Sequence, residues 1–361
     1  MEEYISLEEV FEAYYECRKN KRGTCNALLF ESDYESELVK LHHDINTMTY
    51  EIGKSIAFIV TRPVKREVFA ADFRDRIVHH LIVHRLEPLF ESVFIEDNYN
   101  CRKGKGVMFG VKRLHQQIKE CSENFTRECY IMKNDLQGFF MSIHKPTLWI
   151  MLEKFIWENY TGEDMNILLY LVKKIVLHNP ELNCIRRSPI QMWNGLAANK
   201  SLFTTGKDYG LPIGNLTSQM FANIYLNEID QYVKNTLNAK YYFRYMDDSI
   251  LLIKTKEEAI EKLKRIKEFL EKKLELKLNN KTQIFKNKQG VNFCGYKINE
   301  YRLKIRDRGK RKLKEKVKKL TKEIKEGKIN SKDAKKYLCG HLGYLKIANT
   351  YNIENKLFEK E

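Results

Sequence analysis

The adjacent carboxylates Asp247 and Asp248 stand at an unusual place in the sequence. They separate two apolar, aromatic runs within the stretch YYFRYMDDSILLI of residues 241–253. Residues 241–246 and 250–253 have the composition of two strands, and the polar residues between them predict the turn of a hairpin. An Asp pair in a turn is commonly a solvated turn signal and nothing more. A chemical role therefore needs further partners elsewhere in the chain.

A third carboxylate, Asp135, follows another strand pattern in CYIMKNDLQGFFMSIH, residues 129–144. The middle of the chain then predicts the order strand, helix, helix, strand–turn–strand, helix, strand. This order is compatible with a ferredoxin-like βαββαβ sheet, in which the first strand lies beside the central hairpin. We therefore predict an α+β fold in which Asp135 faces Asp247 and Asp248 at one edge of the sheet.

Three crowded carboxylates repel one another unless cations neutralise them. Their oxygen atoms suit hard ions such as Mg²⁺. Two Mg²⁺ ions, with Mn²⁺ as an alternative, could assist an in-line phosphoryl displacement by activating a 3′-hydroxyl and stabilising a pyrophosphate leaving group. Asp135, Asp247 and Asp248 are the predicted catalytic residues and metal ligands.

The overall composition favours a polyanionic partner. The 361 residues include 64 Lys and Arg against 48 Asp and Glu, which gives a formal charge of +16. Such a surplus indicates nucleic acid or an anionic membrane surface. No apolar run reaches the roughly 18 residues of a membrane-spanning helix, and the acidic, helical start does not have the pattern of a signal peptide. We expect no membrane partner.

Cysteine and histidine spacing predicts no metal centre. The eight cysteines contain no CxxC pair and no zinc-ligand pattern with His. We expect reduced, mostly buried thiols in a cytoplasmic protein. The adjacent pairs His42-His43 and His79-His80 are not predicted metal ligands, because neighbouring side chains diverge on a helix.

YMDD after an aromatic strand, together with the upstream DLQGFF, resembles the reverse transcriptases. Four further stretches resemble motifs of that family in its usual order: DRIVHHLI to NYNCRKGKG within 72–106 (fingers), 210–230 (substrate and template), LELKLNNKTQIF at 274–285 (the lysine motif) and VNFCGYKI at 291–298 (the primer-grip hairpin, with Cys294 for a common Leu). The resemblance implies a right-hand polymerase with fingers, a ferredoxin-like βαββαβ palm and a small helical thumb. The expected boundaries are 1–128 for fingers, 129–145 for palm, 146–209 for an insertion, 210–300 for palm and 301–361 for thumb.

The resemblance also implies roles for single residues. The Leu136 backbone carbonyl would join the metal ligands, and Lys281 would be a general acid for pyrophosphate, with an ordinary surface lysine as the alternative. The expected pocket for dNTP and template consists of Arg102 for the triphosphate, Phe140 as a gate against a ribose 2′-hydroxyl, Ile213, Gly214 and Gln219.

Phe139 is expected in the core, and Thr217 or Ser218 is expected to cap the helix after Gly214. Lys65 and Arg74 are further candidate finger contacts, while Lys103 and Lys105 are expected to be solvated or to touch template. The basic run 304–336 is expected to follow the duplex, with a solvated helix face as the alternative.

WNGLAANKSLF at 193–203 and GLPIGNLTSQ at 210–219 resemble the reverse transcriptases of diversity-generating retroelements. Most reverse transcriptases carry Gln-Gly at Ile213-Gly214 and Ser-Pro at Ser218-Gln219. The resemblance implies cDNA synthesis from a template-repeat RNA, errors at template adenines, a basic accessory protein that forms an oligomeric barrel, and a bacterial or phage origin.

Three alternatives stay open at this point. The chain could be a retron, phage-defence or group II intron-type reverse transcriptase. It could be a catalytically silent RNA-binding scaffold with the same fold. A metal-dependent phosphatase or nuclease is the third alternative, although the finger and primer-grip motifs would have no purpose there.

Overall fold

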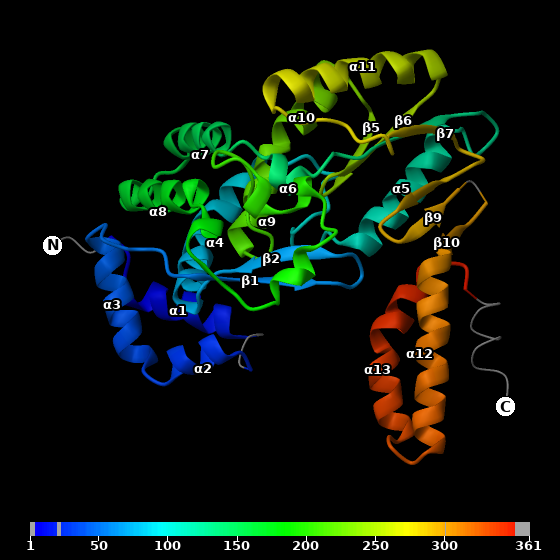
Figure 1. The fold of residues 1–361 in the computed structure, drawn as a ribbon. Coiled ribbons are helices and arrows are strands. Elements are labelled where there is room, and N and C mark those ends of the chain that lie inside the picture. The colour runs from blue at the N-terminus through cyan, green and yellow to red at the C-terminus, as the bar shows by residue number, and fades with distance from the viewer. Residues whose placement is uncertain (1–3, 20–22, 300, 351–361) are drawn as a thin grey trace. The chain divides into compact units, whose positions relative to one another are not determined.

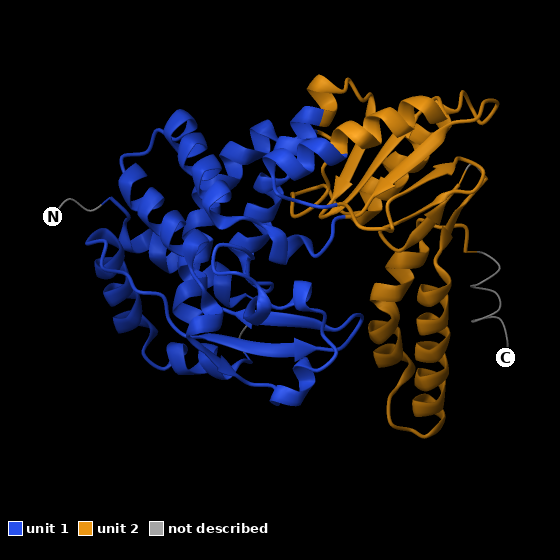
Figure 2. Cartoon of the chain, turned by 45° about the horizontal axis from the view of Figure 1, so that its top comes forward, with its two compact units in different colours: residues 1–95, 136–232, 267–277 blue, residues 96–135, 233–266, 278–361 orange. Residues whose placement is uncertain are grey.

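Two units, each assembled from three separate stretches of the chain, make up the structure. The computed structural model describes residues 4–19, 23–299 and 301–350 (Figure 1). Unit 1 comprises residues 1–95, 136–232 and 267–277, and unit 2 comprises residues 96–135, 233–266 and 278–361 (Figure 2). The chain passes from unit 2 into unit 1 directly after Asp135. The boundaries expected for fingers, palm and thumb lie at other positions and stay predictions.

Unit 2 contains the sheet that carries the three aspartates. Its four strands are β3 (Tyr130–Asn134), β5 (Tyr241–Tyr245), β6 (Asp248–Ile253) and β7 (Gln283–Lys286), in the order β5-β6-β3-β7. All neighbouring strands are antiparallel. The first strand of this set therefore lies between the third and the fourth, which is the ferredoxin-like order. The helix α11 (Lys256–Lys273) connects β6 to β7. The predicted palm topology is confirmed.

The helix α5 (Val107–Cys121) packs against this sheet through a continuous apolar core. Val111, Leu114 and Ile118 lie on its buried face, at helical spacing. They share one cluster with Phe243 and other buried residues of the sheet. Tyr99 lies in the same cluster, and its ring is so close to α5 that a Cβ added at Gly110 would stand 2.5 Å from its Cδ2.

A second small sheet joins a helical hairpin to unit 2. It consists of β8 (Val291–Phe293), β9 (Tyr296–Ile298) and β10 (Leu303–Ile305), and the hairpin consists of α12 (Asp307–Lys325) and α13 (Ser331–Leu345). The strand β10 was not predicted, because residues 301–361 were expected to form a helical unit. The Tyr344 hydroxyl donates to the Gly295 carbonyl at the β8–β9 turn, and the Tyr296 hydroxyl donates to the Tyr344 carbonyl at 2.8 Å. These contacts hold α13 against the hairpin.

Unit 1 is mainly helical around α4 (Phe73–Val93), which contacts α1, α2, α8 and α9. Its N-terminal helices are α1 (Leu7–Arg18), α2 (Cys25–Glu31) and α3 (Tyr34–Asn46), and its later helices are α6 (Phe139–Ser142), α7 (Lys145–Asn159), α8 (Met165–Leu177), α9 (Leu216–Tyr225) and α10 (Asn227–Gln231). The predicted capping box at the start of α1 is confirmed, since Ser6 and Glu9 cap each other's backbone N–H.

A three-stranded sheet in unit 1 anchors the loop-rich segment that follows α8. The sheet has the order β2-β1-β4, from β1 (Ser55–Val60), β2 (Arg66–Ala70) and β4 (Cys184–Arg186). The carboxylate of Glu67 on β2 is buried, and it accepts hydrogen bonds from Trp193 Nε1 at 2.6 Å, Ser201 Oγ at 2.6 Å and the Leu202 N–H at 2.7 Å. The WNGLAANKSLF segment is therefore tied to β2 at both of its ends.

Two expectations about composition can be compared with the structure. None of the eight cysteines forms a disulfide, but only Cys17, Cys121 and Cys129 are buried, so the expectation of mostly buried thiols is wrong. Cys184 and Cys294 are partly buried, and Cys25, Cys101 and Cys339 are exposed. In the described part of the chain, no helix combines the length and the apolar character that crossing a bilayer requires.

Substitution of Gly110 should test the packing of α5. We expect Gly110→Ala to lower the free energy of unfolding by about 1–3 kcal/mol, because the new methyl group would push against the buried Tyr99 ring. Gly340→Ala is the matched control, since Gly340 lies in α13 with no atom within 4 Å of an added Cβ. It should stabilise by up to about 1 kcal/mol. Denaturant unfolding of both variants measures the difference, and equal effects would contradict the packing described for Tyr99.

Candidate active site

Strand register brings the three aspartates to one edge of the unit 2 sheet. Pairing between β3 and β6 ends with Asn134 opposite Ser249, so Asp135 and Asp248 are the next residues beyond that pair. Tyr245 pairs with Asp248, which leaves Met246 and Asp247 as a two-residue turn, with Met246 at a φ of 56°. The predicted turn included Asp248, but its pairing with Tyr245 places it on the strand.

The electrostatics of Asp247 reflect the crowding of these carboxylates. Burial raises the pKa of Asp247 to about 6, and the negative charges of Asp248 and Asp135 add to this effect. Lys133 on β3 offsets part of the charge, since its Nζ lies 3.1 Å from Asp248 Oδ1. Sequence reasoning missed Lys133, although a single Lys in an apolar strand next to Asp135 was a usable signal.

The donor atoms at this edge fit hard divalent ions. The charges of Asp135 and Asp248 contribute to the raised pKa of Asp247, so the site gains from a positive charge, and oxygen is the donor that Mg²⁺ prefers. In the structure, the carboxylate oxygens of Asp135, Asp247 and Asp248 do not all lie within 4.8 Å of one another. The role of the Leu136 carbonyl stays a prediction.

The loop before β7 holds the backbone of Asp135. The Asn279 N–H donates to the Asp135 carbonyl at 2.7 Å, and the Asp135 N–H donates to Thr282 Oγ1 at 3.3 Å. Lys281 lies between these two partners, is exposed, and donates its own N–H to Asn279 Oδ1 at 3.2 Å. The structure thus brings the predicted lysine motif beside Asp135, while the acid role of Lys281 stays a prediction.

The hairpin expected to grip the primer lies beside Asp248. Burial and the charge of Asp248 raise the pKa of Cys294, in the β8–β9 turn, to about 12. The carbonyl of Asn292 on β8 accepts a hydrogen bond from Lys133 Nζ at 3.2 Å, and the Tyr245 and Phe293 rings meet edge to face with centroids 6.4 Å apart. The aspartate edge and this hairpin therefore form one continuous surface of unit 2.

A buried arginine hydrogen-bonds the turn of Met246 and Asp247. Arg244 is only 2% exposed, and its Nη1 donates to the Met246 carbonyl at 3.3 Å. Its backbone N–H donates to the Asp97 carbonyl at 3.0 Å. Arg244 was not among the predicted site residues, although an Arg inside a strand of aromatic residues is an unusual feature.

Two of the predicted pocket residues meet in unit 1. Phe140 and Ile213 pack against the same buried cluster of Ala57, Phe69, Met141 and Leu202. Phe140 is half-buried whereas Phe139 is 3% exposed, so the expected core position of Phe139 is confirmed.

The next residue, Gly214, has a φ of 126°, and an added Cβ would stand 2.8 Å from Val68 Cγ1. A side chain there would be strained and would strike β2. Gly214 therefore lets the chain pass closely over β2 before α9 begins.

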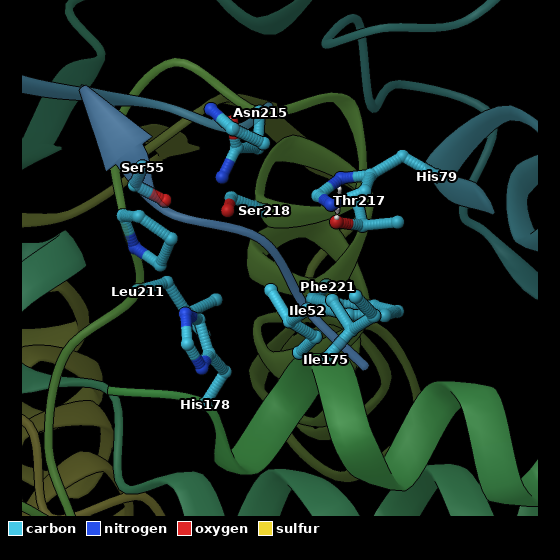
Figure 3. Close-up of a pocket in the computed structure, with 12 residues that line it drawn as sticks. Ile52, Ser55, His79, Ile175, His178, Leu211, Asn215, Thr217, Ser218 and Phe221 are labelled. Carbon is cyan, nitrogen blue, oxygen red and sulfur yellow. Dashed lines mark hydrogen bonds between the residues drawn. The ribbon is translucent and has the colours of Figure 1, made fainter. Parts of the chain in front are cut away.

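The start of α9 differs from the prediction. Asn215 occupies the N-cap position, and neither Thr217 nor Ser218 caps the helix, because both are buried inside its first turn. Burial lowers the pKa of His79 to about 3, so its neutral ring hydrogen-bonds Thr217 Oγ1 at 2.8 Å (Figure 3). Ser218 lines a cavity of about 20 Å³ (Figure 3), which is room for a water molecule and too little for a nucleotide. Gln219 is half-buried.

The predicted basic contacts are engaged within their own units. In unit 2, Arg102 Nη1 donates to the Asn98 carbonyl at 3.1 Å, and Lys105 pairs with Glu96 at 3.0 Å. In unit 1, Lys65 Nζ donates to the Asn194 carbonyl at 2.6 Å. Arg74 pairs with Asp44 at 2.5 Å and lies over the Tyr50 ring. Lys105 is paired with Glu96, its contact with template stays a prediction, and these contacts favour a structural role for Arg74.

Comparisons with known proteins show the family of this chain. The model of the reverse transcriptase (RNA-dependent DNA polymerase) family matches residues 65–298, more than half of the chain. Protein YkfC of Escherichia coli (strain K12) is 25% identical over 258 residues, which are 62% of this chain and 61% of that protein. The chain thus spans about three fifths of the length of this curated relative.

Solved structures of telomerases are also similar. Telomerase from Candida albicans, in complex with the TWJ fragment of telomeric RNA, has a TM-score of 0.50 at 13% identity, over 78% of this chain and 50% of that one. Apo telomerase from Candida tropicalis has a TM-score of 0.48 at 12% identity, over 70% of this chain and 48% of that one. At these identities the Candida albicans likeness speaks for the fold alone.

The fold is that of a right-hand polymerase. The chain belongs to the reverse transcriptase family, whose members are RNA-directed DNA polymerases, a class of nucleotidyltransferases. The predicted α+β fold of the right-hand polymerase type is confirmed.

The raised pKa of Asp247 predicts how stability depends on pH. The folded pKa is about 6, above the roughly 3.9 of an unfolded Asp. Between these values the folded protein keeps a proton that the unfolded chain has lost, so the contribution of Asp247 to stability falls as pH rises through this window. We expect Asp247→Asn to raise the free energy of unfolding at pH 7.5 without divalent ions by on the order of 1–2 kcal/mol.

The same measurement near pH 4 supplies the control. Near pH 4 the folded protein keeps Asp247 largely protonated, and therefore as neutral as the Asn of the variant. The difference in the free energy of unfolding between the variant and the original protein should shrink toward zero. A stabilisation of equal size at both pH values would contradict a raised pKa. Chemical unfolding in EDTA at the two pH values decides the matter.

Proposed function

We propose that this chain is an active RNA-directed DNA polymerase that extends a primer along an RNA template. The observation that carries the proposal is the strand register that places Asp135, Asp247 and Asp248 at one sheet edge, beside the β8–β9 hairpin. Membership of the reverse transcriptase family supports it. A silent scaffold would have no need to keep three mutually repelling carboxylates together.

Each part of the reaction has residues to perform it. Asp135, Asp247 and Asp248 would hold two divalent ions, Mg²⁺ or Mn²⁺. When bound, such ions supply the Lewis acidity that activates a 3′-hydroxyl and stabilises the leaving pyrophosphate. Lys133 balances the charge of Asp248, and Lys281 would donate a proton to pyrophosphate.

Recognition of the nucleotide would use residues from several motifs. The Arg102 guanidinium would bind the triphosphate, because its planar fork matches phosphate oxygens. Phe140 would block a ribose 2′-hydroxyl with its half-buried ring, which favours dNTPs. Ile213, Gly214 and Gln219 would lie against the nucleotide and the template base.

Nucleic-acid binding would draw on the charge of the helical hairpin. The buried side of α12 carries Leu313 and Leu320, while its other faces carry the basic residues of RDRGKRKLKEKVKKLTKEIK. Some of these pair along the helix, as Lys319 does with Glu323 at 3.6 Å. The excess positive charge would bind the phosphates of the template and primer duplex.

We further propose that the enzyme is of the diversity-generating type. IGNLTSQ and WNGLAANKSLF support this type, and the structure ties the latter segment to Glu67 of β2. The enzyme would copy a template-repeat RNA in the cytoplasm of a bacterial host, with a basic accessory protein as partner. Retron, phage-defence and group II intron-type enzymes are the alternatives with the same chemistry.

Primer extension tests the activity. Purified chain with Mg²⁺, dNTPs and an annealed RNA template should extend a DNA primer. Asp247→Ala and Asp248→Ala should each reduce extension by at least about a hundredfold, since each removes a ligand that acts in the transition state. Asp208→Asn, at an exposed loop position of unit 1, is the matched control and should retain activity.

Two outcomes would oppose the proposal. Undiminished extension by the Asp247→Ala and Asp248→Ala variants would show that another site does the chemistry. Silence of the original chain, even with structured RNA and a basic accessory protein added, would favour the RNA-binding scaffold.

Sequencing of the products tests the finer assignment. Ile213 packs in an apolar cluster and offers no hydrogen bond to a template base. Errors should concentrate opposite template adenines, and Ile213→Gln should reduce them several-fold by restoring a polar contact. Ile213→Leu, which keeps the position apolar, should leave the error spectrum unchanged. Accurate copying by the original chain would point to a retron or defence enzyme, and an unaltered adenine error rate in Ile213→Gln would refute the role of Ile213.

A further inference from the structure

A cluster of one carboxylate and two imidazoles lies between α1 and α4 in unit 1. Glu16 Oε2 of α1 is 2.6 Å from His84 Nε2 and 3.6 Å from His80 Nδ1, both on α4. Among the residues that the structure describes, this is the only group of three acidic, His or Cys side chains whose ligand atoms all lie within 4.8 Å of one another. The polymerase site does not use any of the three.

Helix geometry explains why these two histidines meet. Residues four apart lie on the same face of a helix, one turn above the other, and His80 and His84 have this spacing. His79 points elsewhere, toward Thr217. The expectation that His79 and His80 diverge is therefore confirmed. His80 instead lies on the same face of α4 as His84, one turn later in the helix.

The distances suit a tetrahedral metal ion. Zinc binds imidazole nitrogen and carboxylate oxygen at about 2.0–2.2 Å, which separates neighbouring ligand atoms by roughly 3.3 Å. The observed separations of 2.6 and 3.6 Å from Glu16 Oε2 lie on either side of that value, so small side-chain rotations would suffice. Because the side chains of Glu16 and His84 are 45% and 36% exposed, a water molecule could fill a fourth position.

The surroundings of the cluster favour the metal-binding forms of His80 and Glu16. Burial and the charge of His84 lower the pKa of His80, and a hydrogen bond from His84 lowers the pKa of Glu16. Neutral imidazole and ionised carboxylate are the forms that bind metals. Lys19 is the neighbouring group that opposes a cation, since its charge acts on both Glu16 and His80.

We propose that Glu16, His80 and His84 bind a divalent transition-metal ion of the zinc class and thereby fasten α1 to α4. Imidazole donors favour such ions over Mg²⁺, so this site would differ in metal from the aspartate edge. The two helices already share the ion pair of Glu9 with Arg85 at 2.8 Å. The metal would add a second link at Glu16, about two turns further along α1. The proposal does not depend on polymerase activity.

Metal titration of the full chain tests the site. Protein stripped with a chelator is titrated with Zn²⁺ by calorimetry in excess Mg²⁺, which occupies oxygen-only sites. We expect one Zn²⁺ per chain, a rise in the unfolding temperature, and a Zn²⁺ affinity at least about tenfold weaker in His80→Ala and in His84→Ala. His43→Ala, which removes an exposed His of α3, is the matched control and should bind as the original does.

Two further measurements keep the result unambiguous. Glu16→Gln preserves the size of the side chain and should also weaken binding, with circular dichroism showing that the helices remain. Co²⁺ in place of Zn²⁺ should give the visible absorption of a tetrahedral ion without a thiolate charge-transfer band, which excludes the cysteines as ligands. Zn²⁺ binding that is absent, or equally strong in the His80→Ala, His84→Ala double variant, would overturn the proposal and leave a simple His–Glu ion pair.

Discussion

Unit 2 must accommodate the electrostatic repulsion among Asp135, Asp247 and Asp248, and the rest of its structure depends on this constraint. The register of three strands brings these like charges to one edge, where burial, together with the charges of Asp248 and Asp135, raises the pKa of Asp247 to about 6. A fold keeps such an arrangement only if other interactions outweigh the repulsion. The apolar core between α5 and the sheet supplies them, since Phe243, Ile250 and Ile131 are all fully buried there.

Polar contacts then shape the edge for chemistry. Lys133 balances Asp248, Arg244 supports the turn through the Met246 carbonyl, and the loop from Asn279 to Thr282 holds the backbone of Asp135. In unit 1, Glu67 has a comparable role, because its buried carboxylate gathers three donors from the segment after β4. Supporting residues thus decide where the aspartates and the segment after β4 lie.

Two kinds of metal chemistry follow from the two sets of donors. The aspartate edge presents only oxygen atoms, which suit Mg²⁺. Glu16, His80 and His84 present imidazole nitrogen as well, which suits zinc-class ions. A chain that used both would separate catalysis from the anchoring of its N-terminal helix.

The sequence by itself determined the elements with a clear period, the order of the palm strands and the three aspartates. These follow from local hydrophobic patterns, which act over a few residues. Only the tertiary structure decided that Asp248 belongs to β6, that Thr217 meets His79 instead of capping α9, and that Lys133, Arg244 and Glu67 support the sites. It also brought Glu16 to His80 and His84, although His80 lies 64 residues further along the chain. Such contacts depend on register and packing between distant segments, and no local pattern encodes which distant partner a side chain will meet.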